Sequence, residues 1–193
     1  MRLGRKAVAE ADRPRACGWV VDLRRNGGGN MWPMLAVVGP ILGDGEVGMF
    51  VDADGKKSVW TIEDGGPRYA GSSAGWGGGE PVGNADAPVA VLTGGMTASA
   101  GEAVVVAFRG RPDTRFFGER TAGVPTGNEA HRLSDGAILN LTEVKDADRS
   151  GRTYEAPIPP DEEIVSARRP GRAGRDRALE AAGSWLAKQS ACR

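Results

Sequence analysis

Two short segments of this 193-residue sequence place glycines beside residues that could take part in nucleophilic chemistry. Residues 22–29 read Asp-Leu-Arg-Arg-Asn-Gly-Gly-Gly, and residues 94–102 read Gly-Gly-Met-Thr-Ala-Ser-Ala-Gly-Glu. Glycine turns that follow buried strands leave backbone N–H groups free to face an anion. A hydroxyl at the start of a helix lies at the positive end of the helix dipole, which favours an alkoxide-like state. The two segments therefore indicate an oxyanion site with Ser99 beside it.

Each segment also has a purely structural interpretation. Residues 22–29 could be a flexible connection between a strand and a helix. Ser99 or Thr97 could cap the following helix, with Glu102 completing a capping box from Ser99. Thr97 also stands where the Gly-x-Ser-x-Gly hydrolase motif needs its first glycine. His131 is the only histidine, and a lone histidine near a strand is more often structural than catalytic. The residues alone leave these alternatives open.

The surrounding sequence predicts the elements that would position these segments. Apolar runs predict buried strands over residues 19–23 and 89–92, each followed by one of the glycine-rich turns. Strands alternate with helices, which indicates an α/β domain. The remaining expected elements are helices over 31–42, 100–109 and 176–188, a hairpin of 49–51 and 58–62, a mobile surface loop over 65–79, and short strands at 114–117, 131–133 and 137–142.

Composition excludes several classes of protein. Hydrophobic residues make up 40% of the chain, and 25 Lys and Arg balance 25 Asp and Glu, which argues against wholesale disorder and against a nucleic-acid partner. No apolar run is long enough to span a membrane, and no secretory signal follows the basic first residues. Cys17 and Cys192 could pair, but nothing in the sequence requires it. We predict no metal or other cofactor, a lead-in segment over 1–17, and one domain over 18–193.

Four blocks in order resemble one family, the C-terminal processing (tail-specific) serine peptidases and their tricorn core relatives. The blocks are residues 22–28, 97–102, 118–123 (Gly-Glu-Arg-Thr-Ala-Gly) and 158–161 (Ile-Pro-Pro-Asp). The resemblance extends from about residue 18 to the end. Residues 121–128 are most similar to the branch that includes the tricorn core and the nisin-resistance-type peptidases. The resemblance implies a ClpP/crotonase-like α/β domain built from repeated ββα units.

The resemblance also implies a function and a set of site residues. It makes the chain a serine endopeptidase that cleaves peptides or proteins through an acyl-enzyme at Ser99. One oxyanion-hole N–H would come from Ala100 or Ser99 itself, and the other from Gly27 or Gly28. The implied partner is a peptide or protein substrate, and a homo-oligomer is left open.

The sequence departs from the family at the general base. Val124 stands where typical processing peptidases have a lysine, and valine cannot accept a proton. In the tricorn-like branch the base is a histidine from a segment before the Asp-Leu-Arg strand, and the 17 residues there contain none. We therefore interpret the sequence as a C-terminal portion of a longer protein or as a degenerate relative, weakly active or inactive as it stands. His131 is a poor substitute base, and Glu155 loosely matches an acidic residue of the tricorn type.

Two other functions are compatible with the same fold. The first is a non-catalytic module that binds peptides or apolar ligands between the two glycine-rich turns. The second, an acyl-CoA enzyme of the crotonase type, would need a nucleotide site, and the sequence shows none. No compartment is predicted, because members of the family are often exported and this chain has no export signal.

Overall fold

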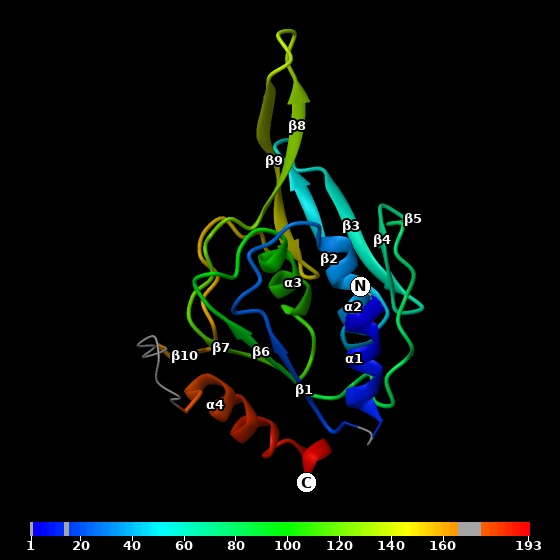
Figure 1. Cartoon of the computed structure of the whole chain (residues 1–193), viewed down its shortest axis with the longest axis vertical. Helices are drawn as coiled ribbons and strands as arrows, with labels where there is room; N and C mark the ends of the chain where they lie inside the picture. The colour runs from blue at the N-terminus through cyan, green and yellow to red at the C-terminus, as the bar shows by residue number, and fades with distance from the viewer. Residues whose placement is uncertain (1, 14–15, 166–174) are drawn as a thin grey trace.

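The computed structural model describes residues 2–13, 16–165 and 175–193 and folds them into two sheets and four α-helices (Figure 1). The elements in chain order are α1 (Arg2–Asp12), β1 (Trp19–Asp22), α2 (Met31–Leu42), β2 (Gly45–Asp52), β3 (Lys57–Glu63), β4 (Gly66–Tyr69), β5 (Ser72–Ser73), β6 (Val89–Thr93), α3 (Ala100–Phe108), β7 (Thr114–Gly118), β8 (Thr126–Arg132), β9 (Ile138–Asp148), β10 (Glu162–Glu163), α4 (Arg177–Leu186) and a 3-10 turn (Ser190–Cys192). The predicted α/β class is confirmed. None of the described helices is both long and apolar enough to cross a membrane.

A four-stranded parallel sheet, in the order β1-β6-β7-β10, forms the centre of the fold. All five residues of β6 are buried, as expected for a strand covered on both faces. Val89 and Val91 belong to the same apolar cluster as α3, whereas Ala90 and Leu92 pack with α4 on the opposite face. Because β1 and β6 are parallel neighbours, the glycine-rich turns that follow them emerge at the same edge of the sheet.

The second sheet is antiparallel and has six strands, in the order β5-β4-β3-β2-β9-β8. Its longest pair, β8 and β9, forms a hairpin whose tip extends beyond the rest of the molecule (Figure 1). The base of this hairpin is held against the body, because the second half of β9 also pairs with β2 from Asp52 to Gly48. Helix α3 packs against the parallel sheet and also contacts β2 and β9.

The expectation that residues 65–79 form a mobile surface loop is wrong for six of these fifteen residues, which are strand. Residues 66–69 and 72–73 form β4 and β5 at the edge of the antiparallel sheet. Several glycines there allow close backbone packing: a Cβ on Gly78 would lie 2.0 Å from the carbonyl oxygen of Asp64, and one on Gly66 would lie 2.8 Å from the nitrogen of Gly78. Four of the seven glycines, at positions 65, 66, 78 and 79, therefore lie in tight contacts, which composition alone cannot distinguish from flexibility.

The predicted helices are found with small differences at their ends. The helix expected over 31–42 is α2, and Asn30 caps it by accepting a hydrogen bond from the N–H of Trp32 at 3.1 Å. The final helix begins one residue later than expected, because Asp176 is its N-cap and accepts from the N–H of Leu179 at 3.1 Å. The lead-in segment contains an eleven-residue helix, α1, and its Val8 packs against the core.

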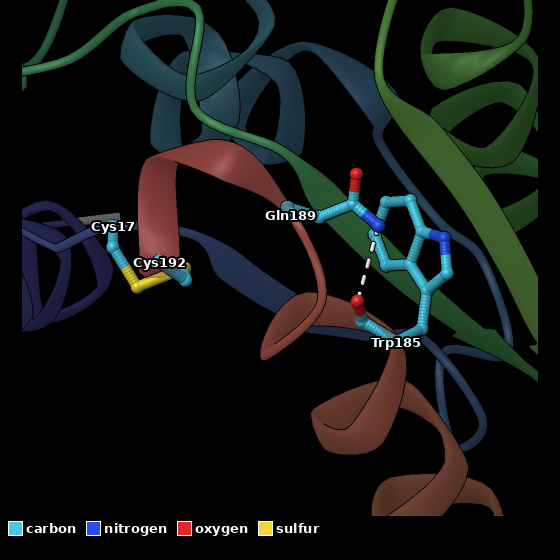
Figure 2. The surroundings of a disulfide bond; sticks show 4 residues. All are labelled: Cys17, Trp185, Gln189 and Cys192. Atoms are coloured by element: carbon cyan, nitrogen blue, oxygen red, sulfur yellow. Dashed lines mark hydrogen bonds between the residues drawn. A yellow bond between two sulfur atoms is a disulfide. The ribbon is translucent and has the colours of Figure 1, made fainter.

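A disulfide joins Cys17 to Cys192, across a sequence separation of 175 residues (Figure 2). The sequence leaves this pairing open, and the fold brings the two Cα atoms to 5.0 Å. On the Cys192 side, the Nε2 group of Gln189 donates to the carbonyl oxygen of Trp185 at 3.1 Å, which continues the last turn of α4 toward the bridge. The bridge thereby ties the end of the chain to the segment entering β1.

Candidate active site

Ser99 lies in the turn between β6 and α3 with an unusual backbone conformation. Its φ is 51° and its ψ is −121°, values that non-glycine residues rarely adopt and that cost about 1–3 kcal/mol. A serine presented on a strained turn between a strand and a helix is also the geometry of the hydrolase nucleophile elbow, although the sequence here lacks that motif. Such strain persists only where neighbouring contacts fix the turn.

Those contacts come from the turn that follows β1. Thr97 is fully buried, and its hydroxyl donates to the carbonyl oxygen of Leu23 at 2.9 Å. The same hydroxyl accepts from the N–H of Gly94 at 3.0 Å, and the N–H of Ala98 donates to the carbonyl oxygen of Asn26 at 3.0 Å. The two glycine-rich turns predicted from sequence are therefore bound directly to each other.

Glycine is required where these two turns touch. A Cβ on Gly28, whose φ is +99°, would lie 2.8 Å from the carbonyl oxygen of Ala98 and 2.9 Å from the Cβ of Ser99. A Cβ on Gly101 would lie 2.4 Å from the carbonyl oxygen of Asn26. Any side chain at either position would push the turns apart, which accounts for two of the glycines that make these segments conspicuous.

Glu102 holds the Ser99 turn to the loop over residues 119–125. Its carboxylate is fully buried and accepts four hydrogen bonds. The N–H of Ser99 and the N–H of Val124 donate to Oε2, each at 2.9 Å, while the hydroxyl of Thr121 and the N–H of Gly123 donate to Oε1 at 2.6 and 2.9 Å. The capping role expected of Glu102 is thus present, as one part of a larger network.

The backbone N–H groups near Ser99 are not equally free. The N–H of Ser99 is used by Glu102, and the N–H of Gly28 donates to Oδ1 of Asn26 at 3.1 Å. Within the described residues, the N–H groups of Ala100 and Gly27 donate to no acceptor. Of the donors suggested by the sequence, these two remain available to a ligand.

A cavity of about 390 Å³ opens beside Ser99. It lies between the start of α2, the start of α3 and the base of the β8–β9 hairpin. Its lining residues are Gly29, Asn30, Met31, Trp32, Phe50, Ser99, Ala100, Ala103, Thr126, Gly127, Asn128, Asn140 and Asp146. The volume falls within the usual range for sites that bind small molecules or peptide side chains.

Asp146 is the one titratable side chain among the cavity-lining residues that the structure describes. It is 1% exposed, and neither oxygen of its carboxylate has a hydrogen-bond partner among the described residues. Burial raises the pKa of Asp146 from its ordinary value of 3.8 to about 7, and the nearby charge of Glu102 acts in the same direction. Sequence analysis misses this residue, because a single aspartate next to Lys145 looks like the solvated end of a strand.

The structure does not bring the other sequence candidates to the cavity. His131 lies on β8, outside the lining, and its Nε2 is 2.6 Å from Oε1 of Glu143 on the exposed hairpin. Glu155 is exposed and accepts a hydrogen bond from Nζ of Lys145 at 2.6 Å. Val124 contributes its N–H to the Glu102 network and has a half-exposed side chain.

The family model described as Peptidase family S41 matches residues 4–164. The chain belongs to peptidase family S41. The match includes both glycine-rich turns and Asp146, as well as most of the lead-in helix α1. The resemblance to C-terminal processing peptidases inferred from four short blocks is thereby confirmed.

Relatives and solved structures of this S41 family member agree with that assignment. The chain is 34% identical over 145 residues to the nisin-resistance protein of Lactococcus lactis subsp. lactis, covering 75% of the chain and 45% of that protein. A lipoprotein from Streptococcus agalactiae superposes with a TM-score of 0.67 at 28% identity, covering 96% of this chain and 61% of that one. The photosystem II D1 C-terminal processing protease superposes with a TM-score of 0.63 at 24% identity, and the match covers 83% of this chain and 38% of that protease.

These comparisons also show how much of such proteins the chain represents. It spans just under half the length of its curated relative and about three fifths of the lipoprotein. At 24% identity, the likeness to the D1 processing protease establishes a shared fold.

Proposed function

We propose that this S41 domain contributes the nucleophile and the oxyanion site of a serine endopeptidase. The observation that most strongly supports this is the strained backbone of Ser99, which lines a cavity together with Ala100, whose N–H has no acceptor among the described residues. The N–H of Gly27, on the adjoining turn, also has no acceptor among them. Family membership supports a peptidase role for the whole protein. The activity itself and its substrate are part of the proposal.

In the proposed reaction, the Ser99 hydroxyl attacks the carbonyl carbon of the scissile peptide bond as its proton passes to a general base. The resulting oxyanion accepts hydrogen bonds from the N–H groups of Ala100 and Gly27. Donors of this kind are each worth about 3–4 kcal/mol of barrier in acyl transfer. The tetrahedral intermediate then releases the amine, which takes up a proton, and water hydrolyses the acyl-enzyme.

Among the described residues, no histidine or lysine lines the cavity, and His131 is engaged by Glu143. By the resemblance to the tricorn-like branch, we propose a histidine general base supplied from outside the described residues.

A fluorophosphonate probe tests the nucleophile directly, because it forms a covalent adduct with an activated serine. Intact-mass measurement should show one adduct, which Ser99→Ala removes and Ser73→Ala, a change at an exposed serine, leaves in place. The comparison is made on the chain and on a form extended at its N-terminus. Labelling that survives in Ser99→Ala, or a Ser99 that stays unlabelled in both forms, would overturn the proposal.

A further inference from the structure

We propose that Asp146 forms an anionic subsite beside Ser99 that receives the positively charged side chain of a lysine or arginine residue in a peptide substrate. This inference rests on the proposed function and names the substrate class of the same site. It assigns a role to a residue that neither the sequence motifs nor the reaction above uses.

The first argument is the unsatisfied carboxylate. Asp146 is 1% exposed, and neither Oδ1 nor Oδ2 accepts a hydrogen bond from any described residue. A buried carboxylate without partners is costly, so proteins normally supply a donor or a cation for it. The backbone groups of Asp146 are satisfied. Its N–H donates to the carbonyl oxygen of Pro125 at 3.0 Å, and its carbonyl oxygen accepts from the N–H of Tyr154 at 3.0 Å. Only the side-chain carboxylate of Asp146 lacks a partner among the described residues, and this side chain lines the cavity.

The second argument is the charge around the cavity. Glu102 acts on Asp146 electrostatically, and the four groups that donate to Glu102 are all neutral. No described residue contributes a positive charge to the cavity lining. The nearest basic residue along the strand, Lys145, is engaged by Glu155. The cavity therefore contains one acidic side chain, with a second carboxylate near it and no positive charge from the described residues, which favours a cationic ligand.

The third argument is the wall of the cavity. Trp32 and Phe50 both line it, with their ring centroids 6.4 Å apart in an edge-to-face arrangement. Aromatic rings attract an ammonium or guanidinium group and also pack against the methylene groups that precede it. Asn128 and Asn140 add amide oxygens that can accept hydrogen bonds from the same group. The lining thus suits both parts of a lysine or arginine side chain.

Binding of matched peptides separates this inference from the proposed chemistry. The probes are acetyl-Ala-Ala-Lys amide and acetyl-Ala-Ala-norleucine amide, which differ by the terminal ammonium group. Isothermal titration calorimetry on the Ser99→Ala chain, at a pH above the pKa of Asp146 so that the carboxylate is ionised, measures affinity without any covalent step. We expect the lysine peptide to bind about tenfold or more tightly than the norleucine peptide, because a hydrogen bond to a charged group is worth that much.

Asp146→Asn keeps the shape of the side chain and removes its charge. We expect this variant to bind both peptides with equal affinity, whereas Glu129→Gln, a matched change at an exposed carboxylate on β8, keeps the preference for lysine. Unchanged binding of the norleucine peptide in Asp146→Asn shows that the cavity is still folded. The preference in the parent chain should also weaken as the pH falls below the pKa of Asp146, since the protonated carboxyl no longer attracts a cation.

Two results would overturn the proposal of a cation-binding subsite at Asp146. One is equal or undetectable affinity for both peptides in the Ser99→Ala chain. The other is a lysine preference that persists in Asp146→Asn, which would show that the cation binds elsewhere. A lysine preference combined with an unreactive Ser99 would instead overturn the proposed function and leave the subsite in place, so the two failures are distinguishable.

Discussion

Asp146→Asn offers a quantitative test of the buried carboxylate, independent of any ligand. In the folded chain burial raises the pKa of Asp146 to about 7, whereas in the unfolded chain the group has its ordinary value near 3.8. Between these values the folded state holds a proton that the unfolded state has released. The stability contributed by Asp146 is therefore largest in acid and is lost as the pH rises toward about 7.

The magnitude follows from the two pKa values. Each pKa unit corresponds to about 1.36 kcal/mol, so the contribution changes by about 3 kcal/mol between about pH 4.5 and about pH 8. The asparagine side chain of the variant does not titrate. The difference in free energy of unfolding between parent and variant should thus shift by that amount in favour of the variant as the pH rises. A constant offset from the unsatisfied amide, about 1–3 kcal/mol, does not affect this shift.

Unfolding in guanidinium chloride without reductant, followed by tryptophan fluorescence, measures the difference in free energy of unfolding between parent and variant at each pH. Glu129→Gln serves as the control, because it makes the same kind of change at an exposed carboxylate outside the cavity. The other acidic groups with displaced pKa values, including Asp148, are common to parent and variant and cancel in the comparison. A parent–variant difference that is flat with pH would refute the reasoning, because it would mean that the carboxylate is already ionised and stabilised in the folded chain.

Three further changes have expected outcomes in the same unfolding assay. Glu102→Gln should lower the free energy of unfolding by about 3 kcal/mol, because the new amide N–H₂ cannot accept from the N–H groups of Ser99 and Val124; an effect below the error of the assay would contradict the network. Ser99→Gly should raise it by about 1 kcal/mol by relieving the positive φ, while abolishing fluorophosphonate labelling; a destabilised variant would argue against strain. Replacing both Cys17 and Cys192 by serine should lower the free energy of unfolding by about 5 kcal/mol in the chain-entropy model, since the closed loop is long. A parent chain treated with reductant should match the double variant.

Local patterns in the sequence are sufficient to locate the Ser99 turn. The strand that precedes it is a continuous apolar run, the helix that follows begins with small residues, and the glycines between them mark a tight turn. Each of these signals lies within about ten residues, and the structure places both glycine-rich turns at one edge of the parallel sheet. The local pattern cannot decide whether Glu102 only caps the helix or also reaches the loop near Thr121, because that contact depends on tertiary packing.

Features that depend on long-range packing are missed or misjudged from the sequence. Asp146 comes 47 positions after Ser99, and only the pairing of β9 with β2 brings its strand beside the cavity. Nothing in the neighbouring residues marks it as buried. The glycines over 65–79 look flexible in the sequence, since their close contacts to Asp64 and to one another involve backbone that the sequence pattern does not specify. The disulfide cannot be predicted from local pattern, because it joins the first and last segments of the chain.

The four hydrogen bonds of Glu102 have a mechanical consequence. One buried carboxylate connects the Ser99 turn to the segment containing Gly123 and Val124, so neither can shift by an ångström without breaking bonds to the other. These bonds make the Ser99 turn and the 121–124 segment one mechanical unit, although 19 or more positions separate Glu102 from that segment along the chain.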